Sequence, residues 1–300
     1  MIFSKLFVAG KAMVIFMIEY IKIAVISLIS GFLAPLPFSY AASYSFLSYI
    51  LDFNKNSQLS VFYYSIISVV FSLVIFISLR KIYFKGFKAL FSTKKSTMPN
   101  RSGYRKFMLN LLISLIPAAV MFVPYKKDKF LLDYFSEQIS ADHLLVTAVC
   151  CAVSGLFLLI GSWYVKQKYA QTKRSSDWKS IVRFSVYQTA SYFFPGISSV
   201  SMGATSFLIS DIDNRVIVRE ILTYIAPSIL ITNVFRLVRS ALTGIVLNPV
   251  VILLCVAFSA VGSAVMIHLI AKIDFRKTCV YFSVFSILFA AVSVAVLFVL

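Results

Sequence analysis

Two apolar stretches of the chain place serines directly after helix-breaking residues, and such serines can hold or attack a phosphate group. The first stretch, residues 30–51, is interrupted at Pro37–Ser39, and the second, residues 185–210, is interrupted at Pro195–Ser198. Proline lacks a backbone N–H donor, so each stretch should break into two shorter helices. The helix that starts after each break has free N–H groups and a positive dipole end, which together attract an anion.

The two interrupted stretches also resemble each other. Each continues from its proline to a Ser-Phe-Leu sequence, at residues 45–47 and at residues 206–208. Paired apolar segments with proline or glycine interruptions indicate an internal repeat with a binding site between its copies. Freed backbone groups at membrane depth must face protein or a water-filled cavity. We therefore favour re-entrant helix pairs over the alternative, two spanning helices with proline kinks.

Charged residues that could serve a site near these breaks are few. Glu19 and Lys22 lie one helical turn apart, either as an intramembrane ion pair or, as we favour, at an interfacial helix end. Arg236 and Arg239 interrupt an apolar stretch and could meet a lipid phosphate, although snorkelling toward the interface is favoured. A further cluster, which is either a solvated loop or part of a site, comprises Asp211, Asp213, Arg215, Arg219 and Glu220.

The cysteines and histidines show no metal-ligand spacing. No CxxC pair or Cys/His cluster occurs, and all four cysteines lie in apolar runs. We expect the cysteines to be small buried residues and the two histidines to be structural. These residues are Cys150, Cys151, Cys255, Cys279, His143 and His268.

The composition predicts the elements that position these residues. Hydrophobic residues make up 60% of the 300 positions and charged residues 13%, with a mean hydropathy of +0.90. A soluble domain carries roughly twice that share of charge. We therefore predict an all-α, polytopic integral membrane protein of one domain, residues 1–300, with about six spanning helices. The predicted spans are Leu59–Leu79, Phe107–Pro124, His143–Val165, Val216–Phe235, Asn248–Ala271 and Thr278–Leu300.

The positive charge of the chain is concentrated in loops. The net charge of +18 arises from 29 Lys and Arg against 11 Asp and Glu, and it gathers at residues 80–106 and 166–183. Such an excess often indicates nucleic-acid binding, but basic loops between apolar runs are typical of the cytoplasmic side of a membrane protein. We therefore expect both loops in the cytoplasm, residues 125–142 outside, and no nucleic-acid partner. Glu19 and Lys22 interrupt the N-terminal apolar run, which we interpret as retained and not as a cleaved signal peptide.

Two sequence patterns at the breaks point to a family. Residues 30–43 partly follow acid-Gly-x-x-acid-Phe-Leu-Pro-x-Ser-Ser-Thr-Gly-His, and residues 195–201 partly follow Pro-Gly-x-Ser-Arg-Ser-Gly-x-Thr. Both patterns are motifs of the bacterial undecaprenyl-diphosphate phosphatase family, also called the bacitracin-resistance family, which this chain resembles. The matching residues are Gly31, Leu36, Pro37, Ser39, Pro195, Gly196 and Ser198.

The resemblance extends over roughly residues 24 to 300. Two further parts of the chain are similar to the family arrangement. They are Ile116–Ala118 after the first basic loop, and Arg215, Glu220 and Pro227 after the second motif. The resemblance implies an inverted repeat with two re-entrant helix pairs, whose halves are residues 24–135 and 143–300. It also implies a location in the bacterial cell membrane and a polyprenyl-diphosphate site that is reached from the outer face.

The chain departs from the family at the catalytic positions. The family's two acids, histidine and arginine are replaced here by Ser30, Ala34, Ser43 and Ser199. Cleavage of a diphosphate needs neutralised charge and an activated nucleophile, and a serine without an adjacent base is a weak nucleophile. The catalytic residues are therefore unknown, and neither a metal nor a cofactor is expected. By resemblance, the substrate-binding residues are Ser39, Gly196, Ser198, Ser199, Arg215 and Glu220.

Three functions follow as hypotheses. The first is a protein like undecaprenyl-diphosphate phosphatase that handles polyprenyl diphosphate or phosphate in cell-envelope lipid-carrier recycling, with lost or altered catalysis. If it is active, it is a hydrolase that works with substituted residues. The second is a non-catalytic binder, flippase or transporter of a lipid phosphate. The third is an unrelated transporter or structural membrane protein. The expected partners are a polyprenyl phosphate or diphosphate lipid and the membrane. Whether the chain forms a homo-oligomer is left open.

Overall fold

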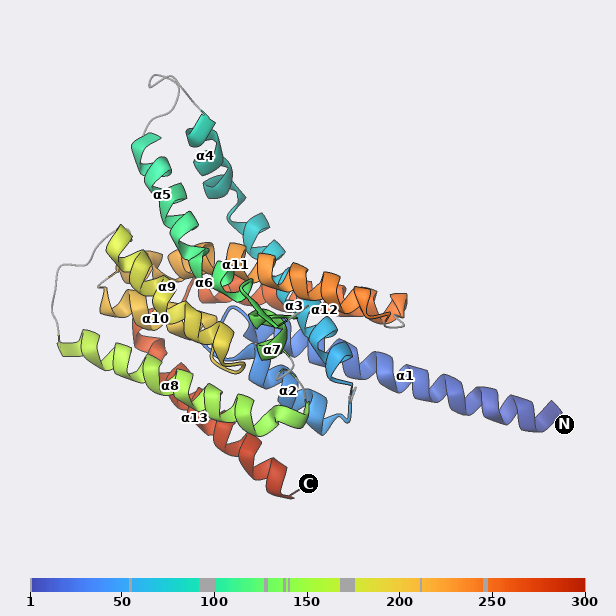
Figure 1. Ribbon diagram of the computed structural model, residues 1–300. Helices are drawn as coiled ribbons and strands as arrows, with labels where there is room; N and C mark the ends of the chain where they lie inside the picture. The colour runs from blue at the N-terminus through green and yellow to red at the C-terminus, as the bar shows by residue number, and fades with distance from the viewer. Residues whose placement is uncertain are drawn as a thin grey trace.

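The computed structural model consists almost entirely of helices (Figure 1). It describes residues 2–53, 56–91, 101–126, 129–136, 139, 141–167, 176–210, 212–244 and 248–299. Helices α1 to α6 comprise Ile2–Leu33, Tyr40–Ile50, Ser57–Ser78, Arg80–Phe91, Arg101–Ser114 and Ile116–Met121. The short strands β1 (Pro124–Lys126) and β2 (Lys129–Phe130), α7 (Leu131–Ser136) and the 3-10 turn η2 (Ala141–His143) follow. Helices α8 to α13 comprise Leu144–Gln167, Trp178–Phe193, Ser199–Ile209, Asn214–Leu242, Pro249–Ile270 and Phe275–Val299.

Six helical segments in the described part of the chain are long and apolar enough to cross a membrane. They are Gln58–Ser78, Ser102–Met121, Ala141–Tyr164, Val216–Leu242, Pro249–Ile270 and Phe275–Val299. Each overlaps one of the six predicted spans, so the prediction of an all-α, multi-pass membrane protein is confirmed. The second span is divided between α5 and α6, because Pro117 occupies the first turn of α6 and restarts the helix there.

The two interrupted stretches form two helical hairpins. The first hairpin consists of α1 and α2, which are separated by residues 34–39, and the second consists of α9 and α10, which are separated by residues 194–198. From its turn, α2 runs toward the end of the molecule where α3 begins, and α10 runs toward the end where α11 begins (Figure 1). These are opposite ends, because the end of α3 lies beside the start of α11, and the start of α3 lies beside the end of α11. Two opposed hairpins match the geometry of an inverted repeat, but the repeat and its two halves stay predictions.

The first hairpin is held to the rest of the molecule by a close helix crossing. A Cβ atom on Gly31 of α1 would lie 2.6 Å from the backbone oxygen of Ser259 in α12, and one on Gly262 would lie 2.5 Å from the oxygen of Leu28. Ser263 also donates a hydrogen bond of 3.0 Å to the carbonyl oxygen of Gly31. Small residues therefore allow the backbones of α1 and α12 to approach, as is common between membrane helices.

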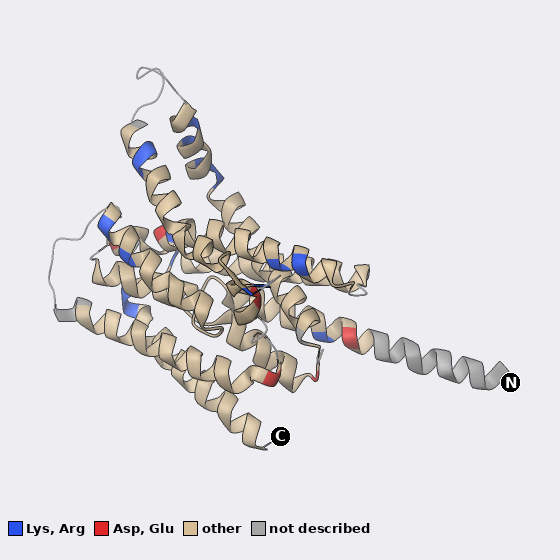
Figure 2. Cartoon of the chain, in the orientation of Figure 1, with Lys and Arg blue, Asp and Glu red and all other residues tan. Residues whose placement is uncertain are grey.

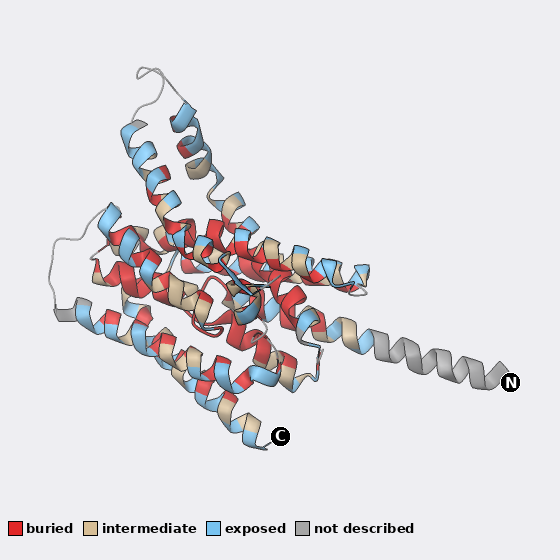
Figure 3. Cartoon of the chain, in the orientation of Figure 1, coloured by how far each residue is buried: buried red, intermediate tan, exposed pale blue. Residues whose placement is uncertain are grey.

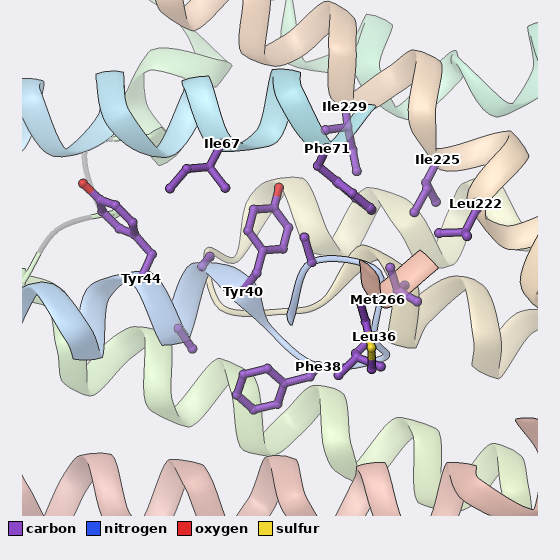
Figure 4. Packing of buried hydrophobic residues seen from close by; sticks show 14 of the residues in the cluster. Leu36, Phe38, Tyr40, Tyr44, Ile67, Phe71, Leu222, Ile225, Ile229 and Met266 are labelled. Carbon is purple, nitrogen blue, oxygen red and sulfur yellow. The ribbon is translucent and has the colours of Figure 1, made fainter. Parts of the chain in front are cut away.

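The centre of the molecule is formed by α3 and α11, which pack against each other between the hairpins. Buried residues concentrate there, whereas exposed residues dominate α4 (Figure 3). Phe71 of α3 and Ile229 of α11 face Tyr40 of α2 in this core (Figure 4). Ser68 and Ser72 are buried in α3 without loss of hydrogen bonding, because each hydroxyl donates to the carbonyl oxygen four residues earlier.

The basic segment after α3 forms two projecting helices. Helices α4 and α5 extend together from the body of the molecule and carry exposed lysines and arginines (Figure 2). Residues 92–100 of the first basic loop and 168–175 of the second lie outside the described residues. The assignment of these loops to the cytoplasm therefore stays a prediction.

Candidate functional site

A cavity lies where the turns of the two hairpins meet. It has a volume of about 30 Å³ and is lined by side chains from both turns, from α3 and α11, and by Ile139. The first hairpin contributes Ser39, Tyr40 and Ala41, and the second contributes residues 191–192 and 195–199. The sequence therefore predicts correctly that residues from both breaks come together.

The first turns of two short helices line this cavity. Ser39 is the N-cap of α2, and its hydroxyl accepts a 3.1 Å hydrogen bond from the backbone N–H of Ala42. Ser198 is the N-cap of α10 and accepts a bond of the same length from Ser201. These caps define where each helix begins after its break. The positive dipole ends of α2 and α10 consequently meet at the same cavity.

The one cation in the described lining of the cavity is Arg236 of α11. Its residue surface is only 7% exposed, so the expectation that Arg236 snorkels to the interface is wrong. Its Nε donates to the hydroxyl of Ser136 at 2.7 Å, and one terminal nitrogen donates to the amide oxygen of Asn233 at 3.1 Å. Both acceptors are neutral. Among the residues that the structure describes, no carboxylate lies within ion-pair distance of this guanidinium.

Serine and tyrosine hydroxyl groups, together with the Asn233 amide, also line the cavity. The hydroxyls of Ser191 and Ser199 lie 2.8 Å apart across the second turn, and the Tyr40 hydroxyl lies 3.1 Å from that of Ser68. The buried hydroxyl of Tyr192 makes no hydrogen bond of standard geometry to the described residues, but Ser228 and Thr232 lie close enough to interact with it. Buried polar atoms usually have such partners.

Gly196 shapes the second turn through its backbone. Its φ angle is +104°, a conformation that side chains strongly disfavour. A Cβ atom at this position would also collide with the backbone of Thr147 in α8. Glycine is thus required for the turn itself. Its predicted contribution to substrate binding is limited to the backbone surface that it gives to the cavity.

The positions at which the family carries catalytic charges lie mostly away from the cavity. Ser30, Ala34 and Ser43 are buried but are not among its lining residues, whereas Ser199 is. The Ser43 hydroxyl donates to the carbonyl oxygen of Tyr40. The described lining contains neither a carboxylate nor a histidine. The cavity can therefore bind an anion, but these residues supply no general base.

One further predicted binding residue, Glu220, is not among the lining residues of the cavity. Glu220 accepts a 2.6 Å hydrogen bond from Ser176, and 16 positions of α11, about 24 Å of helix, separate it from Arg236. The side chain of Arg215 and all of Asp211 lie outside the described residues. Glu19 and Lys22 do form an ion pair, at 3.1 Å, but at a distance from the cavity lining.

A second, wider cavity adjoins the first. It has a volume of about 340 Å³, lies where α3 begins and α11 ends, and shares Arg236 with the narrow cavity. Ser136 and the ion pair between Asp133 and Arg239, at 3.2 Å, also line it. Arg236 therefore lies between the narrow cavity and a wider vestibule on the side of the predicted outer loop.

The described part of the chain does not bring the usual metal ligands together. Within the described residues, no group of three or more His, Cys, Asp or Glu side chains is close enough to bind one ion. The four cysteines are not paired with each other, and Cys151, Cys255 and Cys279 are buried. Whether the chain uses a metal or cofactor stays a matter for experiment.

Comparison with known proteins places this geometry in a family. No curated protein matches the chain. A family model, described as bacitracin resistance protein BacA, matches residues 23–292 and so covers both hairpin turns, the first five spans and most of the sixth. This match removes the hypothesis of an unrelated membrane protein. The chain belongs to the bacitracin resistance protein BacA family, the undecaprenyl-diphosphatase family whose motifs frame the two turns.

Proposed function

We propose that this protein binds the phosphate end of a polyprenyl phosphate or diphosphate in the cavity between the two hairpin turns. The observation that carries the proposal is Arg236, a buried cation whose described partners are two neutral oxygens. A buried charge is costly unless an opposite charge compensates it. A phosphate oxygen at the free guanidinium nitrogen would provide that compensation, in the planar geometry that arginine favours.

The surroundings of Arg236 favour the same ligand. The N-termini of α2 and α10 add two positive dipole ends, and Ser39, Ser198 and Ser199 add hydroxyls that can donate to phosphate oxygens. The wider vestibule is lined mostly by polar and charged side chains, which suit the approach of a phosphate group to Arg236. Since the narrow cavity holds roughly one or two water molecules, the lining side chains must move apart when a phosphate enters.

The same residues favour binding without the family's usual chemistry. An arginine and hydroxyls can stabilise charge on a phosphate, but the described lining provides no base to activate a nucleophile and no carboxylate for a metal. We therefore propose a role in lipid-carrier recycling with lost or altered catalysis, in a bacterial cell membrane and with both basic loops in the cytoplasm. Transport of the lipid phosphate without cleavage is the second candidate, favoured by the two opposed hairpins that meet at one site.

The proposal is tested with purified protein in lipid nanodiscs. The ligands are undecaprenyl diphosphate, undecaprenyl phosphate and undecaprenol, which lacks the phosphate. The measurements are the dissociation constant and the release of inorganic phosphate, with and without Mg²⁺ or Ca²⁺. The variant is Arg236→Gln, and the matched control is Arg183→Gln, an exposed arginine outside the cavity.

We expect both phosphorylated lipids to bind, undecaprenol to bind weakly, and no phosphate to appear. Loss of a charge-assisted hydrogen bond should weaken binding of Arg236→Gln by about 10- to 100-fold, while the control stays within about twofold. Phosphate release by the wild type would show that catalysis is retained. Equal binding of undecaprenol, or full affinity in Arg236→Gln, would reject the phosphate site.

A further inference from the structure

The largest of the pockets described lies at the opposite end of the molecule from the vestibule. It has a volume of about 540 Å³ and is formed by the end of α3, the start of α11 and the end of α12. Its walls are apolar and consist of Ile75, Leu79, Val218, Leu222, Ile267 and Ile270. This volume and lining are typical of a pocket for a small amphiphile. The function proposed above makes no use of it.

The rim of this pocket is positively charged. Arg219 and Lys272 line the rim and are exposed, and Arg80 and Lys81 directly follow the lining residue Leu79. The one carboxylate in the lining, Asp274, already forms a 3.4 Å ion pair with Lys277 and accepts a hydrogen bond from Asn214. The pocket therefore presents excess positive charge above an apolar floor.

The position of the pocket determines which amphiphile can reach it. It lies where three predicted spans end, so its rim is at membrane-interface level and its floor faces the apolar region. It is also at the end of the molecule from which the basic helices α4 and α5 project. Basic pockets between membrane helices bind the head groups of anionic lipids.

We propose that this pocket binds an anionic phospholipid of the surrounding leaflet. The phosphate of the head group lies between Arg219 and Lys272, and one acyl chain packs along Leu79, Leu222 and Ile267. The site is separate from the Arg236 cavity and requires no polyprenyl lipid. Two charged contacts at a membrane surface should favour the anionic over the neutral lipid by about tenfold or more.

The test measures the lipids that remain bound to the purified full-length protein. Delipidated protein is mixed with equal amounts of phosphatidylglycerol and phosphatidylcholine in detergent micelles, and native mass spectrometry counts each lipid. One variant, Arg219→Gln/Lys272→Gln, removes the rim charges. A second, Val218→Phe, fills the pocket and leaves its charge unchanged. The matched control, Lys85→Gln/Lys88→Gln, removes two exposed charges from α4.

The wild type should retain phosphatidylglycerol in about tenfold excess over phosphatidylcholine. Both pocket variants should lose most of that excess, and the control should keep it. Equal retention of the two lipids by the wild type would overturn the proposal. The proposal would also be overturned if the control lost as much of the phosphatidylglycerol excess as the rim variant, since diffuse surface charge would then explain the preference. If Val218→Phe does not fold, the comparison between the rim variant and the control decides.

Discussion

The two hairpins have the same local design but are stabilised by different interactions. In each, a serine caps a short second helix, and a cation on the first helix bonds to the end of the second. Lys22 donates to the carbonyl oxygen of Asp52 at 3.2 Å, and Arg183 donates to the Ser210 hydroxyl at 3.1 Å. Such cations compensate the negative dipole end of the short helix. The frame that presents two helix N-termini to the cavity therefore occurs twice.

The turns themselves differ. The first turn contains Phe38, which is fully buried and packs 4.9 Å and 5.1 Å, between ring centroids, from Phe289 and Phe285 of α13. The second turn contains Gly196 with a positive φ angle and the Ser191–Ser199 hydroxyl pair. Packing thus fixes the first turn, whereas backbone conformation and polar contacts fix the second. Only the second turn offers the cavity more than one serine hydroxyl.

The largest expected effect comes from Gly196→Ala. The alanine would have to adopt the positive φ angle of Gly196, and its Cβ atom would collide with the backbone of Thr147. Together these two effects should destabilise the protein by about 3–5 kcal/mol. We expect the variant to unfold or aggregate in detergent, as measured by thermal unfolding and size-exclusion chromatography. A melting temperature close to that of the wild type would show that the turn tolerates another conformation.

A somewhat smaller loss is expected for Phe38→Ala in the first turn. Removal of a buried aromatic side chain costs about 3–4 kcal/mol. Because the change leaves a cavity and does not distort the backbone, Phe38→Leu should recover at least half of the loss in thermal unfolding. At position 196, by contrast, no substitution of the glycine should recover the stability that Gly196→Ala loses. If Phe38→Leu is no better than Phe38→Ala, ring packing against α13 is not the stabilising interaction.

The two N-caps provide a direct comparison of the hairpins. Ser39→Ala and Ser198→Ala should each destabilise the protein by about 1 kcal/mol, since each removes one capping hydrogen bond. Ser39→Asn and Ser198→Asn should restore most of that stability, because asparagine also caps helices. The measurement is the midpoint of chemical unfolding in mild detergent. Clearly unequal losses would show that the two helices do not depend equally on their caps.

The smallest effect is expected at the cations. Lys22→Met and Arg183→Met should each cost only about 0.5 kcal/mol, because these groups are partly or largely exposed and solvent screens them. The loss should shrink further when salt is raised from low concentration to about 1 M. A loss that does not depend on salt would indicate packing by the side-chain stems and not electrostatics.

Hydropathy and proline placement were sufficient to predict the spans and both breaks. An apolar run of spanning length has few alternatives in a bilayer. A proline removes a backbone hydrogen bond and favours a break where serine or glycine residues follow it, whereas Pro227 lies inside α11 without ending that helix. The burial of Arg236 could not be predicted in the same way. An arginine near the end of an apolar helix looks the same in sequence whether it reaches the interface or is covered, and here Ser136 of α7 lies against it.

Glu220 shows what a motif leaves undetermined about the position of a residue. Its spacing after the second motif suggested a site residue, but α11 carries it away from the cavity, and Ser176 accounts for its hydrogen bond. A position in a motif gives the order of residues along the chain. Which helix end faces the cavity depends on tertiary packing, which the motif does not encode.

The crossing of α1 and α12 has a consequence for biosynthesis. Gly31 and Gly262, which allow this contact, are far apart in the chain, so the first hairpin emerges from the ribosome long before the helix that it packs against. Domains usually begin to fold from the N-terminus during synthesis. Here the face of α1 that contacts α12 stays uncovered until the fifth span has been inserted. The turn of the first hairpin can be supported earlier, because Tyr40 stacks on Tyr64 of α3, the next helix in the chain.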